Sequence, residues 1–156
     1  MSGQIEAKLT EMGIELPQAT APVANYVPYT VLGRTVFISG QVTVWNGDLQ
    51  FQGTVGDGLT VDDGYQAARL CGLNLLAQLK QACGGDLDRV SRVVKLGGFV
   101  SCTPDFVDHP KVINGASDLM VEVFGDAGQH ARFAVGAPSL PLGVAVEVDG
   151  IYELAT

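Results

Sequence analysis

Positive charge is scarce in this sequence. Lysine and arginine together number 9 against 17 aspartate and glutamate residues, which gives a formal net charge of −8 at pH 7. No cluster of basic residues occurs along the chain. Proteins that bind nucleic acids without sequence preference depend on a basic surface. A nucleic-acid partner is therefore not expected, and the acidity mainly promotes solubility.

Cysteine is also scarce, since Cys71, Cys83 and Cys102 are odd in number and widely spaced. No Cys-x-x-Cys motif or Cys/His ligand spacing is present, so we expect neither a metal nor another cofactor. The pattern is typical of reduced thiols in a cytoplasmic protein, where they act as small buried hydrophobic residues. A catalytic cysteine is the alternative, although no obvious activating base is adjacent to any of the three.

Long hydrophobic runs are missing as well, and no stretch approaches the length of a membrane span. The segment from Met1 to Pro17 lacks the basic start and apolar core of a secretory signal peptide. We therefore expect a cytoplasmic protein without membrane partners. The 156 residues suit one domain with a substantial core, and 47% of them are hydrophobic. This apolar surplus fits either a well-filled core or burial between subunits.

The N-terminal part predicts a short helix followed by a linker. Ile5, Leu9 and Met12 recur at helical spacing, and Gly13 would end the helix. We divide the chain accordingly into an N-terminal helix and linker, residues 1–22, and a single domain, residues 23–156.

β-Branched and aromatic residues then predict a hairpin made of strands 25–32 and 35–45. Gly40 inside the second strand indicates a bulge or a close approach by other atoms. Strict alternation would place Gly40 on the same face as the neighbouring valines and isoleucine. Asn46-Gly47-Asp48 is typical of a turn.

The remainder alternates between helices and strands. Thr60 and the acidic residues after it start a long helix that ends at Gly84-Gly85. We expect further strands over residues 90–101, 131–137 and 144–152, and a second helix over 107–124. The Gly97-Gly98 pair marks a bulge or a close contact. The order β-β-α-β-α-β-β predicts an α+β fold whose mostly antiparallel sheet carries two helices on one face.

Two charged residues stand out near the C-terminus. Arg132 lies on one apolar strand segment and Glu147 on the next, with a Leu140-Pro141 corner between them. The planar arginine fork suits an anionic group, and a carboxylate nearby can handle a proton or a water. The alternative is a salt bridge between strands or between subunits, including one with Glu147 itself. Asp149, two residues further on, is expected to be solvated.

Three motifs at set positions resemble the YjgF/RidA family, also called L-PSP endoribonuclease-like. They are Phe37-Ile38-Ser39-Gly40-Gln41, Asp105-Phe106 with Asn114, and Ala131-Arg132 through Leu140-Pro141 to Val146-Glu147-Val148. The resemblance covers roughly residues 23–154 and implies a chorismate-mutase-like fold. The first helix and the segment 44–59 exceed the compact members, which indicates a larger, divergent branch.

The resemblance implies a homotrimer with clefts between subunits and no cofactor. In the family, an arginine in the position of Arg132 grips the carboxylate of a 2-enamine or 2-imine acid. A glutamate in the position of Glu147 places the water that releases a 2-keto acid and ammonia. Substrate-binding positions of the family match Tyr26, Ser39, Gly40 and Asn114.

Departures from the family pattern keep other functions open. Relatives with deaminase activity often carry cysteine where this chain has Ala134, and His130 replaces a proline before the arginine segment. His130 could act as a base in the cleft, whereas His109 is expected at a surface helix start. The alternative function is a non-catalytic trimer that binds small carboxylates or keto acids. An endoribonuclease is disfavoured by the net charge of −8.

Overall fold

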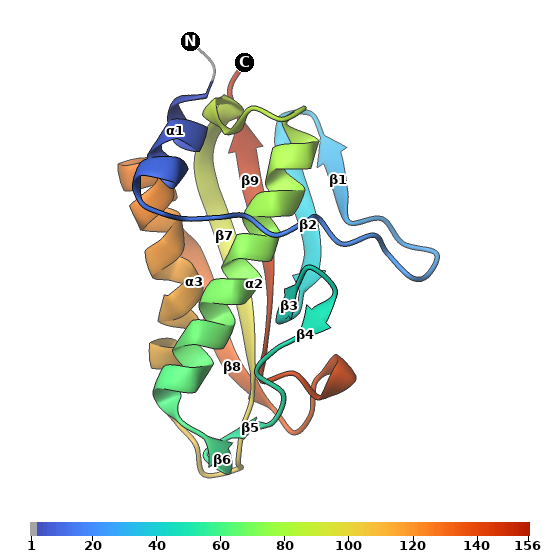
Figure 1. Ribbon diagram of the computed structural model, residues 1–156, viewed down its shortest axis with the longest axis vertical. Helices are drawn as coiled ribbons and strands as arrows, with labels where there is room; N and C mark the ends of the chain where they lie inside the picture. The colour runs from blue at the N-terminus through green and yellow to red at the C-terminus, as the bar shows by residue number, and fades with distance from the viewer. Residues whose placement is uncertain (1–2) are drawn as a thin grey trace.

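A computed structural model describes residues 3–156 and shows one mixed sheet covered by helices on a single face (Figure 1). The helices are α1 (Gln4–Glu11), α2 (Val61–Ala82) and α3 (His109–Phe124). The sheet contains β1 (Tyr29–Leu32), β2 (Thr35–Gln41), β7 (Val90–Ser101), β8 (Ala131–Ala137) and β9 (Val146–Leu154). Its strand order is β1-β2-β9-β7-β8, and every neighbouring pair is antiparallel except β7 and β8. The predicted α+β fold is confirmed.

Short elements fill the connections. Two small strand pairs are β3 (Val44–Trp45) with β4 (Asp48–Leu49) and β5 (Thr54–Val55) with β6 (Gly58–Leu59). Three 3-10 helices are η1 (Leu87–Arg89), η2 (Gly125–Gly128) and η3 (Pro141–Gly143). The β3–β4 turn places Asn46 and Gly47 at φ of 49° and 94°, a left-handed conformation that these two residue types adopt readily.

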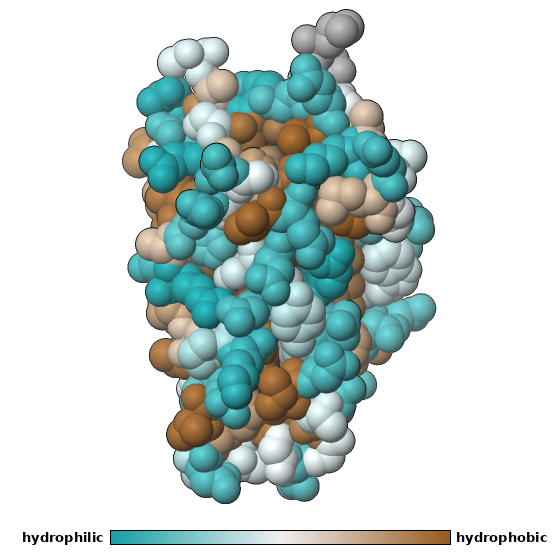
Figure 2. Space-filling view, turned by 90° about the vertical axis from the view of Figure 1, so that its left-hand side faces the viewer, coloured by the Kyte–Doolittle hydropathy of each residue, from teal (hydrophilic) through white to brown (hydrophobic). Residues whose placement is uncertain are grey.

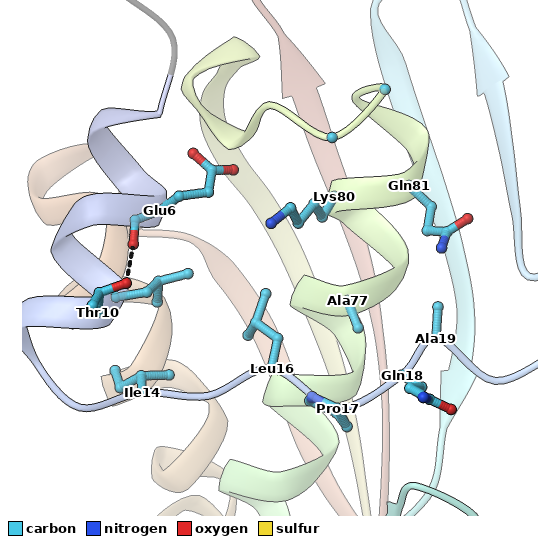
Figure 3. Close-up of a pocket in the computed structure, with 13 residues that line it drawn as sticks. Glu6, Thr10, Ile14, Leu16, Pro17, Gln18, Ala19, Ala77, Lys80 and Gln81 are labelled. Atoms are coloured by element: carbon cyan, nitrogen blue, oxygen red, sulfur yellow. Dashed lines mark hydrogen bonds between the residues drawn. The ribbon is translucent and has the colours of Figure 1, made fainter.

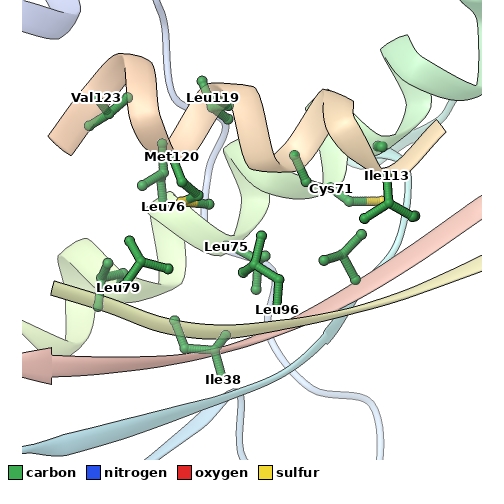
Figure 4. Close-up of a cluster of buried hydrophobic side chains, with 14 of the residues drawn as sticks. Ile38, Cys71, Leu75, Leu76, Leu79, Leu96, Ile113, Leu119, Met120 and Val123 are labelled. Atoms are coloured by element: carbon green, nitrogen blue, oxygen red, sulfur yellow. The ribbon is translucent and has the colours of Figure 1, made fainter. Parts of the chain in front are cut away.

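The core lies between α2, α3 and the helix-facing side of the sheet (Figure 4). Leu75, Leu76 and Leu79 of α2 are fully buried, as is Leu96 of β7. Burying each such leucine contributes about 1.5–3 kcal/mol. Helix α2 begins where the sequence predicts, because Thr60 Oγ1 accepts the Asp63 amide and the Asp63 carboxylate accepts the Thr60 amide.

The opposite face of the sheet has no covering layer in the described chain and points away from the viewer in Figure 1. Phe37, Phe99 and Val135 on this face are 41%, 38% and 42% exposed. Phe99 packs edge-on against Phe133, with ring centroids 5.3 Å apart. We call this aromatic and aliphatic surface the open face.

The predicted orientation of Gly40 is wrong because β2 contains a bulge. The pairing between β2 and β9 shifts register between Ile38 and Gln41, so Gln41 is buried although alternation predicted Gly40 in that direction. Gly40 instead lies on the open face. The bulge also ends β2 at Gln41, earlier than the expected residue 45.

Helix α1 is fixed to the rest of the fold by reciprocal caps. The Asp88 carboxylate accepts the amides of Gln4 and Ile5, while Glu6 Oε1 accepts the amide of Leu87. Lys8 Nζ donates to the carbonyl of Val123 at the end of α3. A cavity of about 700 Å³ remains between α1, the segment that follows it and α2 (Figure 3).

The side of the molecule that carries α1 and α3 is largely hydrophilic, with separate apolar patches (Figure 2). Within residues 3–156, no helix combines the length and apolar character needed to cross a membrane.

Helices α2 and α3 approach each other closely where Gly115 faces α2. A Cβ atom at Gly115 would collide with the Tyr65 carbonyl and lie 3.0 Å from the Arg69 amide nitrogen. Both are backbone atoms, which cannot move aside as a flexible side chain would.

Gly115→Ala is therefore expected to lower the free energy of unfolding by about 1–3 kcal/mol through overpacking. Urea unfolding followed by circular dichroism measures the change. Val121→Ala, at an exposed position of the same helix, serves as the control and should change it by less than about 0.5 kcal/mol. A Gly115→Ala protein as stable as wild type would contradict the close crossing.

Candidate functional site

Arg132 lies on β8, the edge strand, and its side chain is on the helix-facing side of the sheet. It pairs in register with the fully buried Leu96. Its Nη1 donates to Ser117 Oγ at 3.0 Å and its Nη2 donates to the Pro110 carbonyl at 3.3 Å. Both partners belong to α3 and are uncharged. No carboxylate of residues 3–156 lies within 4.0 Å of the guanidinium, so a salt bridge with this chain's own Glu147 is wrong.

His130 orients the hydroxyl that holds Arg132. Its Nδ1 lies 2.6 Å from the Gly128 carbonyl, which can only accept, so this nitrogen carries a proton. In the neutral ring Nε2 then accepts from Ser117 Oγ, 2.9 Å away, while the same oxygen accepts from Arg132. Both ring nitrogens of His130 are thus engaged, and the imidazole positions Ser117 instead of standing free as a base.

Asn114 belongs to the same part of the structure. It is half-buried in α3 and lies between Pro110 and Ser117 at spacings of four and three residues. Positions with these spacings share one helix face. Asn114 therefore lies on the same face of α3 as the two groups that hold Arg132, and we call Arg132, Asn114 and Ser117 the arginine half-site.

Glu147 lies on β9 and projects onto the open face, opposite the buried Val146 and Val148. Its carboxylate rests against Gly40, where a Cβ atom would collide with Glu147 Oε1. Glycine at the β2 bulge thus makes room for the carboxylate. Burial raises the pKa of Glu147, and the negative charge of Asp149 raises it further.

Tyr26 and Ser39 lie near the same bulge. Ser39 Oγ donates to the Val27 carbonyl at 2.8 Å, which ties the loop before β1 to β2. Tyr26, Ser39 and Gly40 line a small cavity of about 80 Å³, and Tyr26 remains largely exposed. We call Glu147, Gly40, Ser39 and Tyr26 the glutamate half-site.

The two half-sites do not meet within one chain. Glu147 pairs with Phe99, whereas Arg132 pairs with Leu96, three residues away on β7. The two residues are thus two strands apart, about 10 Å, and about 10 Å apart along the strands. They also project from opposite faces of the sheet. The Leu140-Pro141 corner between them in the sequence therefore does not bring the two side chains together within one chain.

Two further groups of polar side chains have environments that the sequence alone does not reveal. Asp149 is exposed, as expected, yet partial desolvation raises its pKa, although the Gly97 amide and the charge of Lys95 oppose the shift. Cys102 Sγ lies 3.4 Å from His109 Nε2, so the interpretation that no base adjoins a thiol is wrong. Ser117 could have been found from its spacing, because it follows Asn114 by three residues and therefore shares a face of the same helix.

One acidic cluster has the proximity of a cation site. Carboxylate oxygens of Glu6, Asp86 and Asp88 lie within 4.8 Å of one another. Oxygens of all three already accept backbone amides around α1 and η1. The cluster therefore acts as a set of helix caps.

Comparison with known proteins identifies the family. Residues 6–154 match the model described as "YjgF/chorismate_mutase-like, putative endoribonuclease". The chain belongs to the YjgF/RidA family. It is 49% identical over 154 residues to protein TCP17 of Trypanosoma cruzi, covering 98% of this chain and 96% of that protein.

Solved structures of YjgF/RidA relatives share the fold. A protein of unknown function from Agrobacterium tumefaciens is 46% identical, with a TM-score of 0.90 and coverage of 97% of this chain and 92% of that one. RidA from an Antarctic Psychrobacter is 25% identical, with a TM-score of 0.61 and coverage of 90% and 97%. The chain is more similar to the Agrobacterium protein than to the Psychrobacter RidA in both sequence and fold. This difference is consistent with the larger, divergent branch that the sequence indicates.

The carboxylates of the open face generate a pH-dependent prediction. Asp149→Asn removes one cause of the raised pKa of Glu147, so that pKa should fall while staying above its ordinary value, because burial is the larger cause. A carbon-detected NMR titration of the Glu147 carboxyl measures it. Asp48→Asn, at an exposed position in β4, is the control and should leave the Glu147 pKa unchanged. A Glu147 pKa that stays constant or rises in Asp149→Asn would contradict the coupling.

The sign for stability follows from the same shifts. A pKa raised on folding means that the folded chain binds more protons than the unfolded chain. The stabilisation by Glu147 and Asp149 is therefore complete below their unfolded pKa and is lost as the pH rises through the folded pKa. As the pH rises from the unfolded to the folded pKa of these carboxyls, the free energy of unfolding of wild type should fall relative to that of the double variant Glu147→Gln/Asp149→Asn.

Proposed function

We propose that this chain hydrolyses reactive 2-enamine or 2-imine acids to 2-keto acids and ammonia. The observation that carries the proposal is the guanidinium of Arg132, held by uncharged partners and without a carboxylate within 4.0 Å among residues 3–156. Such a group is ready to bind a substrate carboxylate through two parallel hydrogen bonds. Membership of the YjgF/RidA family supports the same chemistry.

Glu147 supplies the proton chemistry in this proposal. Because its pKa is raised, a larger fraction is protonated near neutral pH than for an ordinary glutamate. The protonated form donates to the β-carbon of a 2-enamine acid, which becomes the protonated imine. The resulting carboxylate then takes a proton from water as the water oxygen attacks the imine carbon. Glu147, protonated again by that water, passes its proton to the carbinolamine nitrogen. The C–N bond then breaks with release of ammonia, and the hydroxyl proton returns to the Glu147 carboxylate as the keto acid forms.

A complete site requires a second copy of the chain. We propose a homotrimer in which the arginine half-site of one subunit faces the glutamate half-site of the next. The open face supports this assembly, because its exposed aromatic and aliphatic side chains surround Glu147 and favour burial. Contact with another subunit would also deepen the desolvation of Glu147 and raise its pKa further.

Substitution of the two charged residues separates the roles. Arg132→Ala should lower kcat/KM about 10- to 150-fold, the equivalent of losing charge-assisted hydrogen bonds worth about 1.5–3 kcal/mol. Glu147→Gln should lower kcat about 10²- to 10⁴-fold and leave ligand binding intact. Ammonia and keto-acid release from imines generated in situ by an amino-acid oxidase measures both. Arg34→Ala, at an exposed arginine paired with Glu153, is the matched control and should keep wild-type rates.

Two outcomes would overturn the enzymatic proposal. If no side chain gives acceleration by a folded oligomer, the deaminase assignment fails. If Glu147→Gln retains full rate, the carboxylate has no part in hydrolysis. Binding of a keto acid that requires Arg132 but involves no turnover would instead identify a non-catalytic carboxylate-binding module.

A further inference from the structure

Cys102 and His109 form a pair that the proposed hydrolysis does not use. Cys102 follows β7, and His109 is the first residue of α3. Cys102 Sγ and His109 Nε2 are 3.4 Å apart, within the range of a sulfur hydrogen bond. The ring of Phe106 meets the imidazole edge-on, with centroids 5.2 Å apart, and fixes its orientation.

Gly136 on β8 makes space for this pair. A Cβ atom at Gly136 would lie 2.7 Å from His109 Nε2 and 2.8 Å from Cys102 Sγ. Any larger residue would displace both reactive atoms. Gly136 faces the same side of β8 as Arg132, because the two are four residues apart on one strand.

The pair opens into a cavity of about 340 Å³ with a mostly apolar wall. Phe106, Pro104 and Pro138 contribute to the wall. Among the described residues that line it, His109 is the sole titratable side chain besides the thiol. A cavity of this size and polarity suits a small neutral molecule.

The thiol needs a base to react. Partial burial raises the pKa of Cys102, although the backbone amide of Ala137 opposes the shift, so the protonated form dominates near neutral pH. His109 Nε2 is placed to take that proton during attack, as an imidazole does for other weak nucleophiles. Cys71 and Cys83 are buried and free, and they provide unreactive references within the same chain.

We propose that Cys102 and His109 form a nucleophilic site for small, neutral α,β-unsaturated carbonyl compounds. The Sγ–H proton passes to His109 Nε2 while sulfur attacks the β-carbon of the electrophile. The electrons of the carbon–carbon double bond move to form an enolate. The imidazolium then returns the proton to the α-carbon, which leaves a thioether and neutral histidine. The net reaction adds S–H across the double bond and needs no oxidant or reductant.

The test measures alkylation of the native full chain by N-ethylmaleimide, with peptide mass spectrometry to follow each cysteine. Cys102 should react faster than cysteines of the urea-denatured chain, while Cys71 and Cys83 stay unmodified. His109→Asn should slow Cys102 by about tenfold or more, as expected for loss of a general base. Arg34→Ala, at the exposed arginine paired with Glu153, is the control and should leave the alkylation rate of Cys102 unaltered. Protection of Cys71 and Cys83 in each variant reports that the fold is intact.

Specific results would overturn the proposal. A Cys102 rate equal to that in urea, or unchanged in both His109→Asn and His109→Gln, removes the role of the histidine. Faster reaction with a carboxylate-bearing maleimide than with the neutral reagent contradicts the stated substrate class. These readouts involve neither Arg132 nor imine hydrolysis, so they are independent of the proposed deaminase function.

Discussion

Alternation of side chains along a β-strand is the constraint on which the functional organisation of this chain depends. Arg132 shares the helix-facing side of the sheet with Leu96, whereas Glu147 shares the open face with Phe99. No rotamer change brings the two together, because the sheet itself lies between them. The proposed site is therefore divided between two faces within one chain, and the apolar open face around Glu147 supports the proposal that a neighbouring subunit completes it.

Glycines let the charged and reactive groups sit within an otherwise tightly packed sheet. Gly40 accommodates the Glu147 carboxylate, and Gly136 accommodates the contact between Cys102 and His109. In the arginine half-site, Ser117 Oγ and the Pro110 carbonyl accept hydrogen bonds from Arg132. Both are uncharged, so they hold the guanidinium without neutralising its charge. In both half-sites the fold fixes the position of a charged group without placing an opposite charge beside it. Arg132 can therefore bind an anionic ligand, and Glu147 binds a proton more readily than an ordinary glutamate.

Elements with strong local signals were predictable from the sequence, and contacts that depend on pairing were not. Strand 90–101 and strand 131–137 agree with β7 and β8, and the start of α2 follows from the Thr60–Asp63 caps. The direction of Gly40 was wrong because the bulge is set by pairing with β9, which lies far away in sequence. The Cys102–His109 contact was missed because the loop between these residues turns back on itself. The matching motifs identified Arg132 and Glu147, but without the strand pairing they did not show that one chain places the two on opposite faces of the sheet.

Subunit complementation tests the central claim most directly. Arg132→Ala and Glu147→Gln chains, each expected to be impaired alone, are unfolded together in equal amounts and refolded as mixed oligomers. If each site combines an arginine half-site from one chain with a glutamate half-site from the next, about a quarter of the interfaces regain both residues in a cyclic assembly. Imine hydrolysis should then recover to about a quarter of the wild-type rate, and separately refolded chains mixed afterwards should show no recovery. Mixed oligomers that remain as inactive as the single variants would contradict a shared site.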